Sequence, residues 1–123
     1  MHFARDDFNS ELLVRAWSPG ELRVGDRHYR RNLVLTADRV IEDWAPQCFE
    51  ELDAACIDAL AELEPEVVLI GTGETLRFPA PACTGGLLSR GIGVEVMDTG
   101  AACRTFNILL SEGRRVVAGL LLK

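Results

Sequence analysis

The sequence predicts one α/β domain with a central, mostly parallel sheet and a small antiparallel β-meander packed to one side. In the second half, the apolar runs VVLI, GVEVM and VVAGLLL alternate with stretches of helix length, which is typical of a βαβαβ unit with buried strands. The first half has short, polar-rich strands separated by Pro-Gly and Gly-Asp turns. At 123 residues, the chain has the length of a single domain, 1–123.

Residues 12–44 are expected to form the meander, with strands in LLVRAW, LRV, YRRNLVL and DRVIEDW. Because polar residues are frequent in these strands, one face of this sheet should meet water. The basic segment 27–31, RHYRR, divides its side chains between the two faces of a strand. We interpret it as a solvated strand face, and a docking surface for an acidic partner is the alternative.

The first helix is predicted at about 47–63. Pro46 suits its first turn, and Pro65 ends it. An apolar stripe recurs at helical spacing and consists of Phe49, Leu52, Cys56, Leu60 and Leu63. This segment should therefore cover one face of the sheet.

Two further segments connect the apolar runs. PAPACTGGLLSR should make a poor helix, because Gly85 and Gly86 each cost about 1 kcal/mol relative to alanine. DTGAACRTFNILLSEGRR should be a good one, with Asp98 or Thr99 as its N-cap and Gly113 at its end. The strands before and after these segments then run parallel with right-handed crossovers.

Charge and hydropathy exclude several function classes. The formal net charge of −6 disfavours nucleic-acid binding, because the phosphate backbone would repel the protein. No apolar run approaches the roughly 20 residues that cross a bilayer, so direct membrane insertion is not expected. Acidic residues Asp6, Asp7 and Glu11 stand where a secretory signal needs a basic start and an apolar stretch. A cytoplasmic location is predicted.

No metal or cofactor site is predicted. The four cysteines include no C-x-x-C pair, and both histidines lie far from them in sequence: Cys48, Cys56, Cys83 and Cys103, with His2 and His28. Without an export signal, disulfides are not expected, and each thiol should be buried as a small apolar group. No catalytic residues are assigned, because no nucleophile has a base placed beside it.

One edge of the sheet is the candidate ligand site. If the strands ending at Ile70 and Met97 are parallel, the loops GTGE and DTG that follow them lie at a common edge, where open α/β sheets usually bind ligands. The N-terminus of the last helix could then bind a small anion. The candidate ligand-binding residues are Gly71, Thr72, Gly73, Glu74, Asp98, Thr99, Gly100 and Arg104.

A purely structural role for these glycines is the alternative. The third position of a G-x-G-x-x-G motif is Leu76 here, and Pro79 and Pro81 delay the next helix, which argues against a dinucleotide. No phosphate-binding G-x-x-x-x-G-K-[ST] motif occurs. The glycines would then serve only to permit positive φ in a tight turn.

Two segments, VVLIGTGETLRFP and GIGVEVMDTGAACRTFNILLSEGRRVVAGLL, resemble an uncharacterised-domain family of small bacterial and archaeal proteins. That family also contains the mitochondrial complex I assembly factor 3. The resemblance covers nearly the whole chain and implies a layered α/β domain with a central mixed sheet and a few strands to one side. It implies no catalytic residues. The matching motif positions are Gly71, Thr72, Gly73, Asp98, Thr99, Ala101, Ala102, Thr105 and Asn107.

Two functions follow as hypotheses. The first is a non-catalytic interaction or assembly-factor-like domain that docks on another protein, such as a subunit of a membrane-associated complex. It predicts an exposed patch with Trp17, Tyr29 or Trp44 as anchors. The second is a binding protein or enzyme for a small anion at loops 71–74 and 98–100. The first is favoured because the catalytic groups that the second needs are missing.

Overall fold

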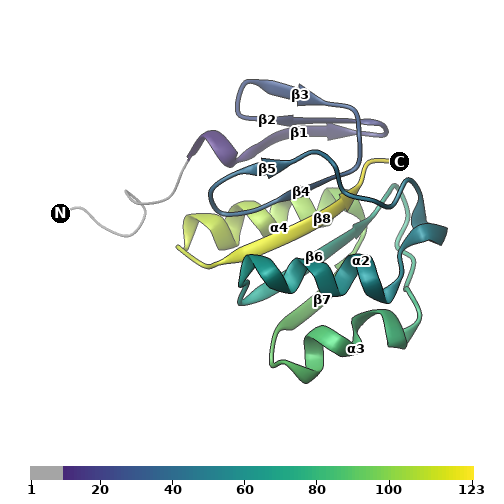
Figure 1. The fold of residues 1–123 in the computed structure, drawn as a ribbon. Helices are drawn as coiled ribbons and strands as arrows, with labels where there is room; N and C mark the ends of the chain where they lie inside the picture. The colour runs from purple at the N-terminus through teal and green to yellow at the C-terminus, as the bar shows by residue number, and fades with distance from the viewer. Residues whose placement is uncertain (1–9) are drawn as a thin grey trace.

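The computed structural model describes residues 10–123 and arranges them as two sheets, with helices on both faces of the larger one (Figure 1). Asp6, Asp7 and His2, on which the sequence analysis drew, lie outside the described residues. The α/β class predicted from the sequence is confirmed.

The smaller sheet is an antiparallel meander. A 3-10 turn, η1 (Ser10–Leu12), precedes β1 (Val14–Ser18), β2 (Glu21–Val24) and β3 (Arg27–Tyr29), which pair in that order. Both tight turns use a glycine with positive φ, Gly20 at +88° and Gly25 at +57°. The first two predicted strands and the turns after them are confirmed, but the predicted strand over 29–35 is divided between β3 and a later strand.

The larger sheet has five strands in the order β5-β4-β8-β6-β7. β6 (Val67–Thr72) lies between β7 (Gly93–Met97) and β8 (Val116–Leu121) and runs parallel to both, which confirms the βαβαβ unit. β4 (Leu33–Leu35) pairs antiparallel with β8, and β5 (Val40–Ile41) pairs antiparallel with β4. The sheet is thus mixed, as the family resemblance implies.

The predicted membership of β4 and β5 in the meander was wrong. All three residues of β4 are buried, so this strand needs cover on both faces, and only the central sheet provides it. The prediction for β7 was also wrong, because this strand is less buried than expected. It was expected to be covered on both faces, but it is the edge strand, and Glu95 is exposed on it.

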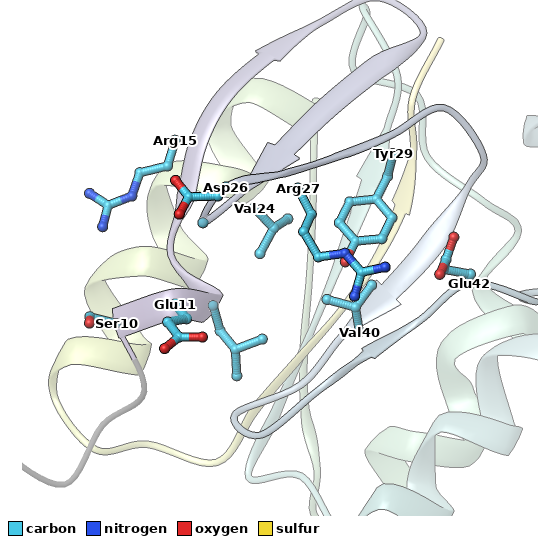
Figure 2. Close-up of a pocket in the computed structure, with 11 residues that line it drawn as sticks. Ser10, Glu11, Arg15, Val24, Asp26, Arg27, Tyr29, Val40 and Glu42 are labelled. Atoms are coloured by element: carbon cyan, nitrogen blue, oxygen red, sulfur yellow. The ribbon is translucent and has the colours of Figure 1, made fainter.

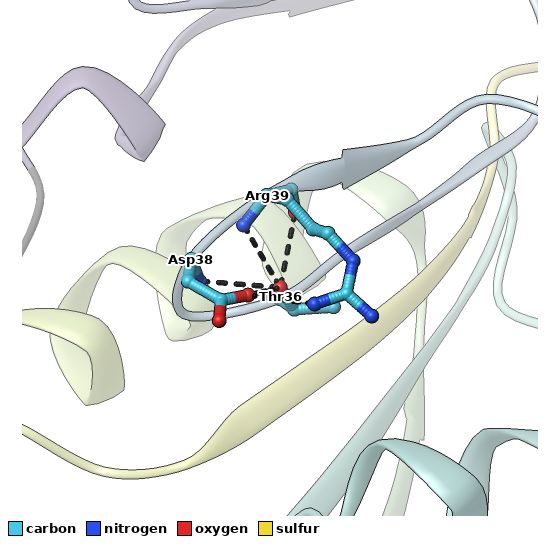
Figure 3. A network of polar contacts seen from close by, with 3 residues as sticks. All are labelled: Thr36, Asp38 and Arg39. Carbon is cyan, nitrogen blue, oxygen red and sulfur yellow. Dashed lines mark hydrogen bonds and ion pairs between the residues drawn. The ribbon is translucent and has the colours of Figure 1, made fainter.

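The turn between β4 and β5 is closed by its own polar groups (Figure 3). The Thr36 hydroxyl accepts hydrogen bonds from the backbone N–H groups of Asp38 (3.2 Å) and Arg39 (3.0 Å). It lies 2.8 Å from Asp38 Oδ1, to which it can donate. These contacts satisfy a buried threonine locally, so the network has a structural role.

Helices cover both faces of the larger sheet. α4 (Thr99–Ser111) packs between this sheet and β1 of the smaller one, with Phe106 and Leu110 buried. Asp98 is its N-cap and accepts from Ala101 N at 2.9 Å, which confirms the predicted start. On the other face, α3 (Pro81–Ser89) packs against α2 (Ala54–Asp58).

The predicted helix over 47–63 is broken into three pieces. η2 (Phe49–Glu51) is an isolated 3-10 turn, and α2 begins only at Ala54 before continuing as the 3-10 segment η3 (Ala59–Leu63). Asp53, not Pro46, marks the start, because its carboxylate accepts from Cys56 N at 2.9 Å.

α3 forms despite its glycines. A Cβ at Gly86 would overlap the Asp58 carboxylate, so the glycine is what lets α3 approach α2 closely. In residues 10–123, no helix combines the length and apolarity that a membrane crossing requires.

Candidate functional site

The two predicted loops meet at one edge of the larger sheet. Thr99 N donates a hydrogen bond to Gly73 O at 2.9 Å, and Gly73 N donates to Thr99 Oγ1 at 2.8 Å. The parallel pairing of β6 with β7 brings these loops together, as predicted from the sequence. We call residues 71–73 and 98–100 the rim.

Thr99 joins three elements at the rim. Its side chain is fully buried, and its hydroxyl donates to Leu121 O at 2.5 Å while it accepts from Gly73 N. Thr72 closes the adjoining loop, because its hydroxyl donates to Thr75 O at 2.7 Å and accepts from Arg77 N at 3.2 Å. The polar atoms of both threonines are therefore used within the chain.

Close packing explains the two glycines of the loop. A Cβ on Gly71 would lie 2.9 Å from both Thr99 Oγ1 and Leu120 Cδ2. Gly73 has φ of +99°, and a Cβ there would overlap the carbonyl of Lys123. The amides of Gly73, Thr99 and Ala101 all donate to protein oxygens. An anion at the rim would have to compete with those bonds, and its binding there stays a prediction.

The candidate residues do not line one common pocket. Thr72 and Glu74 line a groove of about 620 Å³. Gly100 and Arg104 line a separate hollow of about 190 Å³, together with Trp17 and Asn107. Asn107 fixes α4 to β1 there, since it donates to Val14 O at 2.9 Å and accepts from Val14 N at 2.8 Å.

The larger of these hollows lies at the carboxyl ends of β6 and β8, and we call it the basic groove. Four cationic side chains line it, against two carboxylates: Arg30, Arg31, Arg77 and Lys123, against Glu50 and Glu74. The groove also exposes part of the turn at Cys48 and Phe49. Because ligands of open α/β sheets bind at this edge, the groove is the best-placed candidate site.

Arg77 is the most firmly held of these cations. Its guanidinium lies 4.1 Å from the centroid of the Phe49 ring and donates to Glu50 Oε2 at 2.8 Å. That hydrogen bond is the main reason why the pKa of the Glu50 carboxyl lies below its usual value. Arg77 thus ties loop 73–80 to the 3-10 turn η2.

A third hollow, of about 520 Å³, lies between the smaller sheet and β5 (Figure 2). Its wall carries Arg15 and Arg27 beside Glu11, Asp26 and Glu42. Cations and carboxylates thus alternate around it, so it favours no single class of ion. In the segment 27–31, the residue 27 and 28 side chains are exposed, which agrees with a solvated strand face.

The predicted aromatic anchors do not form an exposed patch, and this part of the prediction was wrong. Tyr29 and Trp44 are buried, and Trp17 is partly buried with its Nε1 donating to Leu122 O at 3.2 Å. The Trp44 ring covers Gly119 of β8, where a Cβ would lie 2.6 Å from the ring. These aromatics pack as core residues: Trp44 lies against the backbone of β8, Tyr29 belongs to the buried core, and Trp17 packs against that core.

Other large apolar side chains are exposed instead. Phe78 is 72% exposed and Leu76 is 50% exposed, both in loop 73–80. Leu88 on α3 and Ile108 on α4 are also exposed. The sequence signal for this exposed loop was the alternation Leu-Arg-Phe just before two prolines, in a segment that belongs to no strand or helix.

The cysteines are free thiols and differ in burial. Cys103 is buried, as predicted, and burial raises the pKa of its thiol to about 12. Cys48 is exposed, so the prediction of burial was wrong there. Within the part of the chain that the structure describes, no three His, Cys, Asp or Glu side chains gather as a metal site would require.

Residues 14–121 match the family described as "Protein of unknown function (DUF498/DUF598)". The chain belongs to this family. A crystal structure of a Bordetella parapertussis protein is similar to this chain, with a TM-score of 0.86 and 35% sequence identity, over 94% of this chain and 98% of that one.

Two named proteins are similar to this DUF498/DUF598 chain over most of its length. The assembly factor 3 of the NADH dehydrogenase [ubiquinone] 1 alpha subcomplex from Bos taurus is 32% identical over 89% of this chain. The aligned part is 65% of the bovine protein, just under two thirds of its length. The "13 kDa major membrane protein" of Francisella tularensis is 30% identical over 94% of this chain and 95% of its own.

Proposed function

We propose that this DUF498/DUF598 chain is a non-catalytic protein-interaction domain of the assembly-factor type, which docks on a protein of a membrane-associated complex. A cytoplasmic location is part of the proposal. The relationship to the bovine assembly factor supports the class of function. The observation that carries the proposal is the display of Leu76 and Phe78 on a loop that is fixed at its base.

The base of the loop is rigid because its polar groups are satisfied. The rim bonds between Gly73 and Thr99 hold its start, and the Thr72 hydroxyl bridges to Thr75 O and Arg77 N. In this proposal the rim residues support the loop rather than bind a ligand. A preorganised loop loses less conformational entropy when it binds, which favours affinity.

Arg77 fixes the middle of the loop to the body of the domain. It is held against Phe49 and Glu50, while its neighbours Leu76 and Phe78 are exposed. Buried aromatic and arginine side chains dominate the binding energy at protein interfaces. An exposed phenylalanine beside an ordered arginine therefore supplies the anchor for a partner protein.

Site-specific photo-crosslinking tests this proposal. A benzoylphenylalanine at position 78, introduced in the full chain in living cells, should yield a discrete adduct with a subunit of a membrane-associated complex. Ile108 is the matched control, since it is a large exposed apolar residue on a different element, α4. No adduct from position 78, or the same adducts from 78 and 108, would overturn the proposal.

A matched pair of substitutions gives a second readout. Phe78→Ser should abolish the complex without changing the stability of the domain, because the side chain is mostly exposed. Leu88→Ser, an equally simple change at an exposed residue of α3, should leave the complex intact. Equal losses from both variants would show that the docking surface lies elsewhere.

A further inference from the structure

We propose that the basic groove binds an acidic segment of the partner protein. This inference rests on the proposed function and adds the chemistry of the partner. It predicts that the partner presents several carboxylates in a row next to the apolar group that contacts Leu76 and Phe78.

The groove and the exposed loop form one continuous surface through Arg77. This residue lines the groove, and its neighbours in sequence on both sides are the exposed Leu76 and Phe78. The groove is also lined by residues 30–32, by Leu121 at the end of β8 and by Leu122 after it. A chain that anchors on Phe78 therefore passes beside the cations.

Two of the four cations have no carboxylate partner. Within residues 10–123, neither Arg31 nor Lys123 makes an ion pair, and Arg30 reaches Glu21 only at 3.4 Å, on an oxygen that His28 also contacts at 2.9 Å. Arg77 neutralises Glu50, which leaves Glu74 as the one unpaired carboxylate of the groove wall. The groove is thus positive on a chain whose formal net charge is −6.

The arrangement of these cations favours a protein segment over a small anion or a lipid surface. They come from three separate stretches of chain and are exposed, so an extended segment with several carboxylates can pair with more than one of them. Glu50 and Glu74 stand among them and would be repelled by an anionic bilayer. A protein segment with several carboxylates in a row beside an apolar residue can pair with the arginines and place its apolar residue near Leu76 and Phe78.

Fluorescence anisotropy with a labelled acidic peptide, EDEFEDLE, tests the inference. Purified protein should bind it saturably in 20 mM NaCl and several-fold more weakly in 150 mM NaCl, because the Debye length falls to about 8 Å at physiological salt. Arg31→Glu should weaken binding at least tenfold. Arg90→Glu is the matched control: this arginine is also exposed, but it lies beyond α3 at the opposite edge of the sheet, where β7 begins.

Three results would overturn the inference. The first is that the peptide does not bind at 20 mM NaCl. The second is that Arg31→Glu and Arg90→Glu weaken peptide binding equally. The third is that phosphatidylserine vesicles or inorganic phosphate bind saturably and in an Arg31-dependent way while the peptide does not bind. Urea midpoints of both variants confirm that each remains folded. An adduct from position 78 that persists with Arg31→Glu, combined with failure of the peptide, would sink the groove inference and leave the docking proposal standing.

Discussion

Replacing Thr99 by valine tests how the rim is held together. Valine has the shape of threonine but replaces the hydroxyl by a methyl group. Two buried backbone groups then lose a partner: the N–H of Gly73, now 2.8 Å from Thr99 Oγ1, and the carbonyl of Leu121, now 2.5 Å from it. The N–H and the carbonyl both contact the fully buried Thr99 side chain, so water cannot replace the hydroxyl without a rearrangement.

The expected loss follows from the cost of leaving buried polar groups unpaired. Each such group costs about 1–3 kcal/mol, and the Leu121 carbonyl is at the lower end because its second lone pair remains available to other donors. The hydrophobic gain of the added methyl offsets about 1 kcal/mol. Thr99→Val should therefore lower the free energy of unfolding by roughly 1–3 kcal/mol.

Urea unfolding followed by circular dichroism measures this difference, with the slope m unchanged if the transition stays two-state. Thr105→Val is the control, because it makes the same substitution in the same helix, and within the described residues the Thr105 side chain makes no hydrogen bond. Its effect should stay near 0.5 kcal/mol or less. Equal midpoints for the two variants would refute the assignment of Thr99 as the joint of the rim.

Three other predictions follow from the same contacts. Gly73→Ala should destabilise the fold by about 2 kcal/mol or more, because the residue has a positive φ and the new Cβ would overlap the Lys123 carbonyl. Gly85→Ala in α3 should instead stabilise the fold by about 0.5–1 kcal/mol, because a Cβ there meets open space. The opposite order of melting temperatures would contradict this prediction. Asn107→Ala should cost about 1–3 kcal/mol in urea unfolding, since it leaves the N–H and C=O of Val14 without their partners; an unchanged midpoint would refute that role. At pH 8, a thiol reagent should label Cys48 quickly and Cys103 only on unfolding, because the pKa of about 12 keeps that buried thiol protonated; equal labelling rates would contradict its burial.

Hydrophobic pattern made the second half of the fold predictable. The buried strands at 67–72 and 116–121 are continuous apolar runs in the sequence, and the cap at Asp98 with the glycine at 113 predicted the bounds of α4 nearly to the residue. The edge position of β7 was harder to predict, because Gly93–Met97 has the apolar pattern of a buried strand. Only the order of strands in the sheet shows that it is an edge strand. Local pattern specifies elements well and their neighbours poorly.

The errors in the first half came from competing local signals. The helix over 47–63 looked continuous because its stripe has the right period, yet Asp53 was a capping residue inside that stripe. The aromatic anchors were misplaced because Trp44 has no sequence signature that distinguishes a docking residue from a core one. What decides its position is Gly119, 75 residues later, whose missing side chain leaves room for the indole ring.

The glycine-rich loop shows why a motif alone could not reveal its role. A turn after a buried strand exposes amides, and the direction of those amides decides between a ligand and the protein itself. Here Gly73 N and Thr99 N donate to each other's residues, so the rim is occupied by its own bonds, while the chain beyond it displays Leu76 and Phe78. Substitutions at the rim should therefore act through stability, and substitutions at Phe78 should alter binding with stability unchanged. A rim variant that keeps full stability but loses the partner would reverse this division of roles.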